Sequence, residues 1–205
     1  MARSPRNAKV VMRTREAILD GAMVAFAQQG YHAVTVKDIA TAAGYTAPSL
    51  YNYFGSKEEI FAALLERLFR VFIGIYDEPV PSGLSFAQRL ELMIRRHLDE
   101  HLRQSDAFVL FMKAQLAAMP SEELARWKHQ AFEAYIDRLT RWIEESASGE
   151  ELAPYGARTL AFQLWGTMFA DFARMLLGED LEADPAAHTQ RIVSLFLHGI
   201  RGGST

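Results

Sequence analysis

The 205-residue sequence contains no cysteine, which excludes disulfide bonds and zinc sites built from thiolates. It also has no run of about 18 apolar residues uninterrupted by charge, the length that a membrane-spanning helix needs. Its basic start, residues 1–9, lacks the apolar run of a signal peptide. These absences predict a cytoplasmic protein without a membrane partner.

Most catalytic signatures are missing as well: there is no G-x-S-x-G, no phosphate-binding P-loop and no G-x-G-x-x-G. One catalytic pattern is present, because His97, Glu100 and His101 read H-x-x-E-H, and both histidines of this pattern share one helix face and could ligate zinc. A third, distant ligand would be required, and an amphipathic helix with two histidines at its polar edge explains the same residues. A helical zinc-dependent hydrolase is therefore the alternative, and we predict no enzyme, no metal site and no cofactor.

Charge is distributed unevenly along the chain. Residues 1–57 carry seven Lys and Arg against three Asp and Glu, whereas the remainder carries a net charge of −7. A basic front on an acidic body suggests a polyanionic partner for the front, although a solvated surface with a flexible basic tail explains the charge equally well. The basic residues before the first acid, Glu16, are open to both readings, as an arm that reaches DNA or as a solubilising tail: Arg3, Arg6, Lys9, Arg13 and Arg15.

Helical periodicity dominates the chain, and no stretch alternates as a strand, which predicts an all-α fold of about nine helices. A first helix is expected over residues 9–29, with Gly30 as its end. A second should begin at Thr35 with Asp38 completing a capping box, and should end at Gly44. Thr46 is expected to cap a third, short helix with Pro48 in its first turn, and Ser56 with Glu59 a fourth over residues 56–76. The inward side of the fourth helix is expected to be formed by Ile60, Leu64, Leu68 and Phe72.

The clearest break in the chain is the Pro- and Gly-containing segment 79–83. Longer helices should follow over residues 86–104, 106–119, 121–146, 154–177 and 185–201. Their expected starts are Ser85, Ser105, Pro120-Ser121, Pro154 and Asp184-Pro185, with Gly149 and Gly178 as stops. We therefore expect an N-terminal domain of the size of a DNA-binding domain at residues 1–57. The helix over residues 56–76 should join it to a helical domain at residues 77–205.

The stretch from Thr35 to Lys57 carries the strongest functional signal. Two short helices joined by residues 43–46 form a helix-turn-helix, because Gly44 can adopt the left-handed conformation that a sharp turn requires. The second helix is short enough to enter a major groove about 12 Å wide. Its expected exposed side chains are Ala47, Ser49, Tyr51, Asn52 and Tyr53.

From Arg15 to Leu65 the sequence resembles the TetR family of bacterial regulators, in order and without gaps. The residues that carry the resemblance are Gly30-Tyr31, Thr35-Val36, Ile39-Ala40, Ala43-Gly44, Leu50-Tyr51, Tyr53-Phe54 and Ser56-Lys57-Glu58. The resemblance implies an N-terminal three-helix helix-turn-helix domain and a C-terminal helical domain that binds a small effector and forms a homodimer. It further implies a repressor that leaves a pseudopalindromic operator in double-stranded DNA when the effector binds.

The resemblance also assigns the DNA contacts. It implies phosphate contacts for Thr35, Lys37, Tyr51 and Lys57. The other implied DNA-binding positions, at the start of the recognition helix and along it, are Thr46, Ala47, Pro48, Ser49, Asn52 and Tyr53. This sequence departs from the family's commonest turn at Tyr45, which we expect to pack inside. The recognition helix has no Arg or Lys, so we expect apolar contacts of Ala47 and Pro48 with thymine methyl groups.

For the body, the resemblance implies an effector pocket between the middle helices and a dimer interface on the last two long helices. The implied pocket residues are Met93, His97, His101, Phe108, Phe111, Met112, Gln115, Tyr135 and Trp165. Few of them are charged, so the expected effector is apolar or aromatic with one or two polar groups. The implied interface residues are Leu164, Thr167, Met168, Asp171, Phe172, Met175, Ile192, Leu195, Phe196 and Gly199.

Overall fold

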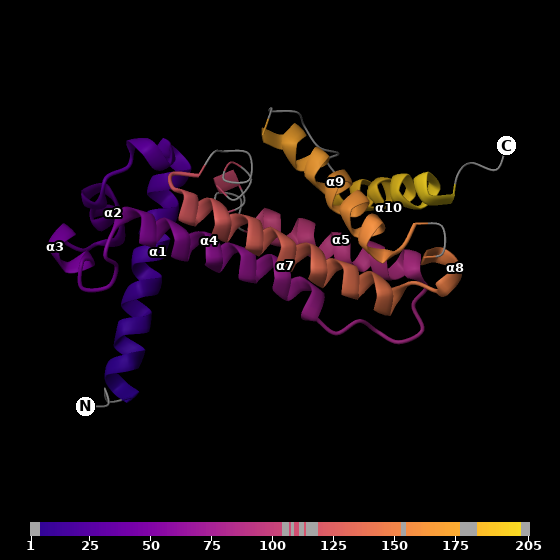
Figure 1. Ribbon diagram of the computed structural model, residues 1–205, viewed down its shortest axis with the longest axis horizontal. Coiled ribbons are helices and arrows are strands. Elements are labelled where there is room, and N and C mark those ends of the chain that lie inside the picture. The colour runs from indigo at the N-terminus through magenta and orange to yellow at the C-terminus, as the bar shows by residue number, and fades with distance from the viewer. Residues whose placement is uncertain are drawn as a thin grey trace. The chain divides into compact units, whose positions relative to one another are not determined.

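The computed structural model describes residues 5–103, 107, 109–110, 113, 119–152, 155–176 and 184–201, without the side chains of residues 5–8, 101, 172, 175–176 and 199–201. Every regular element of these residues is a helix, which confirms the all-α fold class (Figure 1). The chain divides into two compact units. The first unit comprises residues 1–68 and 105–125, and the second comprises residues 69–104 and 126–205.

The first unit begins with α1 (Pro5–Ala33), in which Gly30 interrupts the helical backbone with a φ of 77°. The predicted break at Gly30 is therefore confirmed, and the helix starts at Pro5 rather than near Lys9. The basic segment from residue 5 onward is thus helical, not an extended tail. Figure 1 shows its N-terminal turns reaching beyond the neighbouring α2.

Gly21 lies where α1 packs on α2 (Val36–Ala43). A Cβ atom added to Gly21 would lie 2.6 Å from the backbone nitrogen of Ala43 and 2.7 Å from its Cα and Cβ atoms. Only glycine fits at this crossing, because real Cβ atoms do not approach backbone so closely. The two helices are therefore in direct backbone contact.

Local capping chemistry begins α2 and α4 (Lys57–Gly74) as predicted. Thr35 and Asp38 form a complete capping box. At α4 the Ser56 hydroxyl accepts a hydrogen bond from the Glu59 amide at 3.0 Å, and the Glu59 carboxylate accepts one from the Gly55 amide at 2.6 Å. The four side chains expected on the inward side of α4 are all buried.

The core of the second unit is made by η1 (Ile75–Asp77), α5 (Phe86–Arg103), α7 (Glu122–Ser146), α9 (Ala157–Leu176) and α10 (Pro185–Arg201). Helix α10 packs on α5 and α9. The starts predicted at Ser85, Ser121 and Asp184 are confirmed, because each side chain bonds a backbone amide of the following helix. The helix expected at 106–119 and the stop expected at Gly178 fall largely or wholly outside the described residues.

Gly149 was expected to stop a helix, and that prediction is wrong. Helix α7 ends at Ser146, and Gly149 opens a further short helix, α8 (Gly149–Leu152). Its start is set by Ser148, whose amide and hydroxyl both donate to the Glu151 carboxylate, at 2.7 and 2.9 Å. This Ser-x-x-Glu capping box was present in the sequence and identifies the helix that the glycine obscured.

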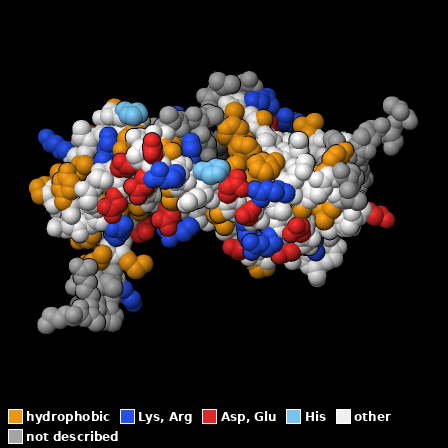
Figure 2. Space-filling model, viewed as in Figure 1, with side chains coloured by type: hydrophobic (Ala, Val, Ile, Leu, Met, Phe, Trp, Pro, Cys, Tyr) orange, Lys and Arg blue, Asp and Glu red, His pale blue; other side chains and the backbone are white. Residues whose placement is uncertain are grey.

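Ion pairs bind the helices of each unit at the surface. In the first unit, Arg67 on α4 pairs with Glu16 and Asp20 on α1 at 3.1 and 2.8 Å. In the second, Arg158 on α9 pairs with Glu133 and Asp137 on α7. On the face of the molecule that Figure 2 shows, Lys and Arg side chains lie next to Asp and Glu side chains. Exposed pairs of this kind contribute about 0–1 kcal/mol each, so burial of apolar side chains supplies most of the stability.

Candidate functional site

The turn between α2 and α3 (Ala47–Leu50) is made by Gly44, whose φ of 75° lies in the left-handed region. The amide of Tyr45 closes the turn by donating to the Ala40 carbonyl oxygen at 2.8 Å. Residues of ordinary chirality rarely adopt this backbone, so the glycine sets the direction in which α3 leaves α2. The predicted helix-turn-helix geometry is confirmed.

Helix α3, the turn that continues it (residues 51–53) and Phe54 bury one side and expose the other. Leu50 and Phe54 are only 1% and 2% exposed, and they fix the short helix to the core of the first unit. Tyr51 is 57% exposed, and Asn52 and Pro48 are also exposed. The exposed side therefore carries a phenol, an amide and an apolar ring, each able to meet the edges or backbone of a nucleic acid.

Two hydroxyl groups assigned to DNA have partners within the chain. The Thr35 hydroxyl donates to Asp38 at 2.6 Å, and these Thr35 hydrogen bonds lower the pKa of the Asp38 carboxyl. The Ser49 hydroxyl donates to the Thr46 carbonyl oxygen at 2.7 Å. Thr46 occupies the predicted cap position, but its side chain makes no capping hydrogen bond. The remaining assigned positions are exposed or half-buried: Lys37, Thr46, Ala47 and Tyr53.

Lys57, at the start of α4, is half-buried. Its ammonium group donates to the carbonyl oxygens of Tyr31 and Val34 at 2.9 and 2.8 Å and lies 4.4 Å from the centroid of the Tyr31 ring. An ammonium group has three donors, so one remains for a phosphate. Lys57 thus also holds the turn that precedes α2.

Tyr45 was expected to pack inside, and that prediction is wrong, because the side chain is 38% exposed. It precedes the exposed residue Thr46 at the start of α3. The left-handed Gly44 turns the chain outward at this point, a consequence that the position of the glycine in the sequence could have indicated.

A polar cluster lies in the apolar core of the second unit. The hydroxyl groups of Tyr76 and Tyr135 are 2.7 Å apart, and the His97 ring centroid lies 5.3 Å from that of Tyr76. Nδ1 of His97 is 3.0 Å from the carbonyl oxygen of Met93. The structure therefore brings together three predicted pocket residues, and adds Tyr76, which the sequence analysis missed.

All three titratable groups of this cluster are neutral at pH 7. Burial raises the pKa of Tyr76 well above its ordinary value and that of Tyr135 to about 12. Burial also lowers the pKa of His97 to about 4, because the charged ring would lose its hydration. The cluster can therefore exchange hydrogen bonds with a neutral polar group, and it offers no charge to an ionised one.

The low pKa of His97 predicts an acid-sensitive second unit. Between pH 6.5 and 4 the unfolded chain binds a proton at this residue that the folded chain does not, so stability falls as pH falls. The loss reaches about 3 kcal/mol, from about 1.4 kcal/mol per pKa unit. Urea unfolding at pH 7 and 4.5 should show a smaller loss for His97→Gln than for the wild type. The matched variant His129→Gln, at an exposed position on α7, should keep the wild-type loss; equal losses in all three proteins would refute the assignment.

The other predicted pocket residues fall elsewhere. Trp165 lies in a second aromatic group, with ring centroids 4.9 Å from Phe132 and 5.0 Å from Phe169. Outside the described residues lie Phe108, Phe111, Met112 and Gln115. His101 lies on α5, but its side chain is not described.

The zinc alternative finds no support in the described part of the chain. The carboxylate of Glu100 pairs with Arg103, and His97 is buried beside Tyr76. Among the described side chains, no group of three or more His, Asp or Glu is arranged to hold a metal ion.

No helix in the described ranges is both long and apolar enough to cross a membrane.

Several residues predicted for a dimer interface are instead buried within one chain. Asp171 on α9 faces Arg174, His188 and Arg191 at 3.6 to 3.7 Å, a cluster that links α9 to α10. The other predicted interface residues that are buried within one chain are Leu164, Met168, Ile192 and Phe196, each at most 4% exposed. Leu195 is 60% exposed and Thr167 half-buried. The side chains of Phe172, Met175 and Gly199 are not described.

Comparison with known proteins agrees with this geometry. The model of the bacterial regulatory proteins of the tetR family matches residues 18–64. The HTH-type transcriptional repressor KstR2 of Rhodococcus jostii is 41% identical over 80 residues, which span 39% of this chain and 39% of that protein. KstR2 of Mycobacterium tuberculosis is 30% identical over 143 residues, 68% of this chain and 72% of that protein.

Similarity of fold extends over nearly the whole chain. The crystal structure of the transcriptional regulator FadR from Bacillus subtilis, in complex with stearoyl-CoA, matches with a TM-score of 0.75. The match covers 90% of this chain and 98% of that one, at 21% identity. The matched family segment contains the helix-turn-helix built on Gly44. The chain therefore belongs to the TetR family of bacterial regulatory proteins and is a DNA-binding transcription regulator.

Proposed function

We propose that this protein is a homodimeric repressor that binds a pseudopalindromic operator through α3 and leaves it when a small apolar effector binds. Residues 1–57 act as the DNA-binding domain, residues 56–76 as the connecting helix, and residues 77–205 as the effector-binding and dimerisation domain. A ligand releases DNA when it binds the released state of the dimer more tightly than the DNA-bound state.

The exposed side of α3 is the observation that carries the proposal. Tyr51 and Asn52, in the turn that continues α3, are exposed, while Leu50 and Phe54 anchor the helix and this turn from behind. Such a helix presents its outer side to a major groove without disturbing the core. Asn52 can pair with the adenine edge, and Pro48 can contact a thymine methyl group. No Lys or Arg lies between Lys37 and Lys57, so sequence preference depends on these polar and apolar contacts.

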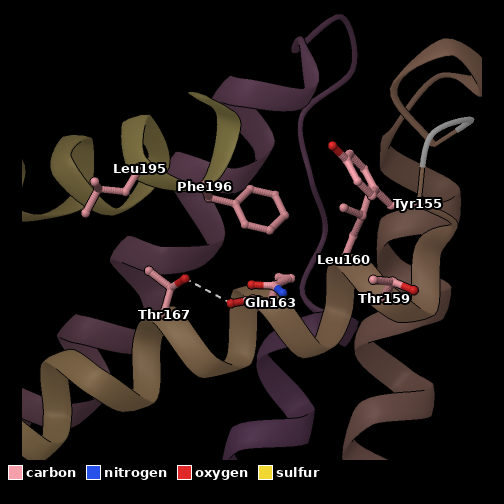
Figure 3. Close-up of a pocket in the computed structure, with 7 residues that line it drawn as sticks. All are labelled: Tyr155, Thr159, Leu160, Gln163, Thr167, Leu195 and Phe196. Carbon is pink, nitrogen blue, oxygen red and sulfur yellow. Dashed lines mark hydrogen bonds between the residues drawn. The ribbon is translucent and has the colours of Figure 1, made fainter. Parts of the chain in front are cut away.

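The exposed side of α9 and α10 supports the proposed dimer. A hollow of about 220 Å³ lies on it, lined by Tyr155, Thr159, Leu160, Gln163, Thr167, Leu195 and Phe196. Figure 3 shows the Phe196 ring pointing between α10 and the first turns of α9, with Leu195 on the neighbouring side of α10. In a two-fold dimer each exposed Leu195 meets the same surface of the other copy, so the contact forms twice.

The neutral cluster in the second unit supports an effector with an apolar part and a neutral polar group. Tyr76, Tyr135 and His97 offer hydrogen bonds without charge, in a core of apolar side chains. The FadR protein of similar fold is described in complex with stearoyl-CoA, whose acyl chain is apolar and whose thioester carbonyl is neutral, whereas its phosphate groups are charged. Stearoyl-CoA is therefore the first effector to test, with free coenzyme A as its control.

Selection from random duplex DNA tests the function directly. The purified protein should enrich a pseudopalindrome, with affinity that falls steeply as salt rises because phosphate contacts release counterions. Asn52→Ala should change the preferred base at one position of each half-site by about 1–3 kcal/mol. Stearoyl-CoA, but not coenzyme A, should release the enriched DNA. If no sequence is enriched at any salt concentration, the proposed operator recognition is wrong.

A further inference from the structure

The turn that continues the recognition helix, residues 51–53, ends at the Tyr53 carbonyl group, which no amide of the helix satisfies. The amides of Tyr53 and Phe54 both donate to the Leu50 carbonyl oxygen, at 2.8 and 3.0 Å, and continue the helical turn beyond α3. The last carbonyl oxygens of a helix point beyond its end and have no amide partner in the helix. A helix this short is marginal by itself, so the group that satisfies these oxygens affects its position.

Arg15 on α1 supplies that group. One of its Nη atoms donates a hydrogen bond to the Tyr53 carbonyl oxygen, and its Cζ atom lies 3.9 Å from the centroid of the buried Phe54 ring. A planar guanidinium can stack on an aromatic ring and donate in its own plane at the same time, which an ammonium cannot do. The positive charge also lies at the C-terminal end of the helix, where the helix dipole favours a cation.

We infer that Arg15 is a positioning residue for operator recognition: it caps the end of the recognition helix from α1 and thereby fixes the direction of Tyr51 and Asn52. The inference rests on the proposed role of α3 in reading DNA. It takes Arg15 out of the group of arm residues, whose guanidinium or ammonium groups could meet phosphate. Arg15 is half-buried and is committed to the protein rather than to DNA.

A phosphate contact and a positioning contact respond differently to charge-preserving substitution. Arg15→Lys keeps the charge but loses the fork that stacks and donates together, whereas Arg15→Met keeps the apolar contact with Phe54 and loses the charge. If Arg15 positions α3, both variants should bind the selected operator about tenfold more weakly, the typical effect of one lost charge-assisted hydrogen bond. The dependence of log affinity on log salt should stay at the wild-type slope, because no phosphate contact has been removed.

Two reference variants calibrate the measurement. Lys37→Met removes an exposed cation at the start of α2 and should flatten the salt slope by about one unit. Arg141→Met removes an exposed cation on α7 and should change neither affinity nor slope. Near-wild-type binding by Arg15→Lys, together with a slope reduced by about one unit in Arg15→Met, would show a direct phosphate contact and overturn the inference.

A second readout needs no DNA. Amide hydrogen exchange in the unbound protein should be about tenfold faster at Tyr53 and Phe54 in Arg15→Lys than in the wild type, because the turn loses its cap. Arg141→Met should leave these amides unchanged. Unchanged exchange in Arg15→Lys would refute the capping role even if Arg15→Met does not fold. If exchange is faster in Arg15→Lys but the wild-type protein enriches no operator, the capping role of Arg15 is supported and the proposed function is rejected.

Discussion

Replacing Gly21 by alanine should destabilise the first unit and weaken DNA binding by about tenfold or more. The new methyl group would meet the backbone nitrogen and Cα of Ala43 at 2.6 and 2.7 Å, and these atoms cannot rotate away as a flexible side chain could. Overpacking of this kind costs about 1–3 kcal/mol, which exceeds the gain of up to about 1 kcal/mol that alanine brings to a helix interior. Helix α2 must move off α1, and α3 follows because the Gly44 turn joins them.

Thermal unfolding and operator affinity measure this effect together. Gly74→Ala is the matched control, because Gly74 ends α4 with a helical φ of −60° and an added Cβ meets nothing within 4 Å. It should unfold at or above the wild-type temperature and bind DNA normally. If Gly21→Ala matched this control in both measurements, the result would contradict the close approach of α1 to α2 at Gly21.

Leu195→Asp should convert the protein to a monomer and abolish cooperative binding to the full operator. Leu195 is 60% exposed on α10, and burying a leucine contributes about 2 kcal/mol in each copy. Two-fold symmetry doubles the loss, so the dimer dissociation constant should rise by about a thousandfold. A buried carboxylate without a partner adds to this effect.

Sedimentation velocity over a range of concentrations measures the change in assembly. Leu102→Asp provides the control, since Leu102 is 66% exposed on α5 and does not line the hollow on α9 and α10. That variant should remain dimeric and keep operator affinity. A dimeric Leu195→Asp protein would place the contact between copies on another surface.

Local chemistry made the front of this protein readable from sequence. Thr35 with Asp38, and Ser56 with Glu59, start their helices through bonds between residues three apart, so the spacing alone identifies them. Gly44 fixes the turn for the same reason, because its backbone conformation is a property of one residue. The helix-turn-helix was therefore predictable, and the same glycine turns Tyr45 outward, which our sequence analysis did not anticipate.

The body was less readable because periodicity gives a helix its apolar side without naming the partner. Leu164 and Phe196 were assigned to a second copy of the chain, yet both are buried within one chain. Asp171 was assigned to the interface for a related reason, because the sequence does not show its arginine partners within the chain, three residues away on α9 and on α10. Tyr76 was missed because only the fold brings its hydroxyl group to that of Tyr135, 59 residues later.

On α3 and the turn that continues it, different residues support the fold and face the solvent. Leu50 and Phe54 are almost fully buried, whereas Pro48, Tyr51 and Asn52 are exposed. Surface substitutions usually change stability by less than about 0.5 kcal/mol, so the three exposed positions can vary while the helix keeps its place. After a gene duplication, two descendants could thus acquire separate operators through changes at these positions alone. Because the buried and the exposed positions are different residues, a single substitution at an exposed position can change the operator preference and still leave a folded protein.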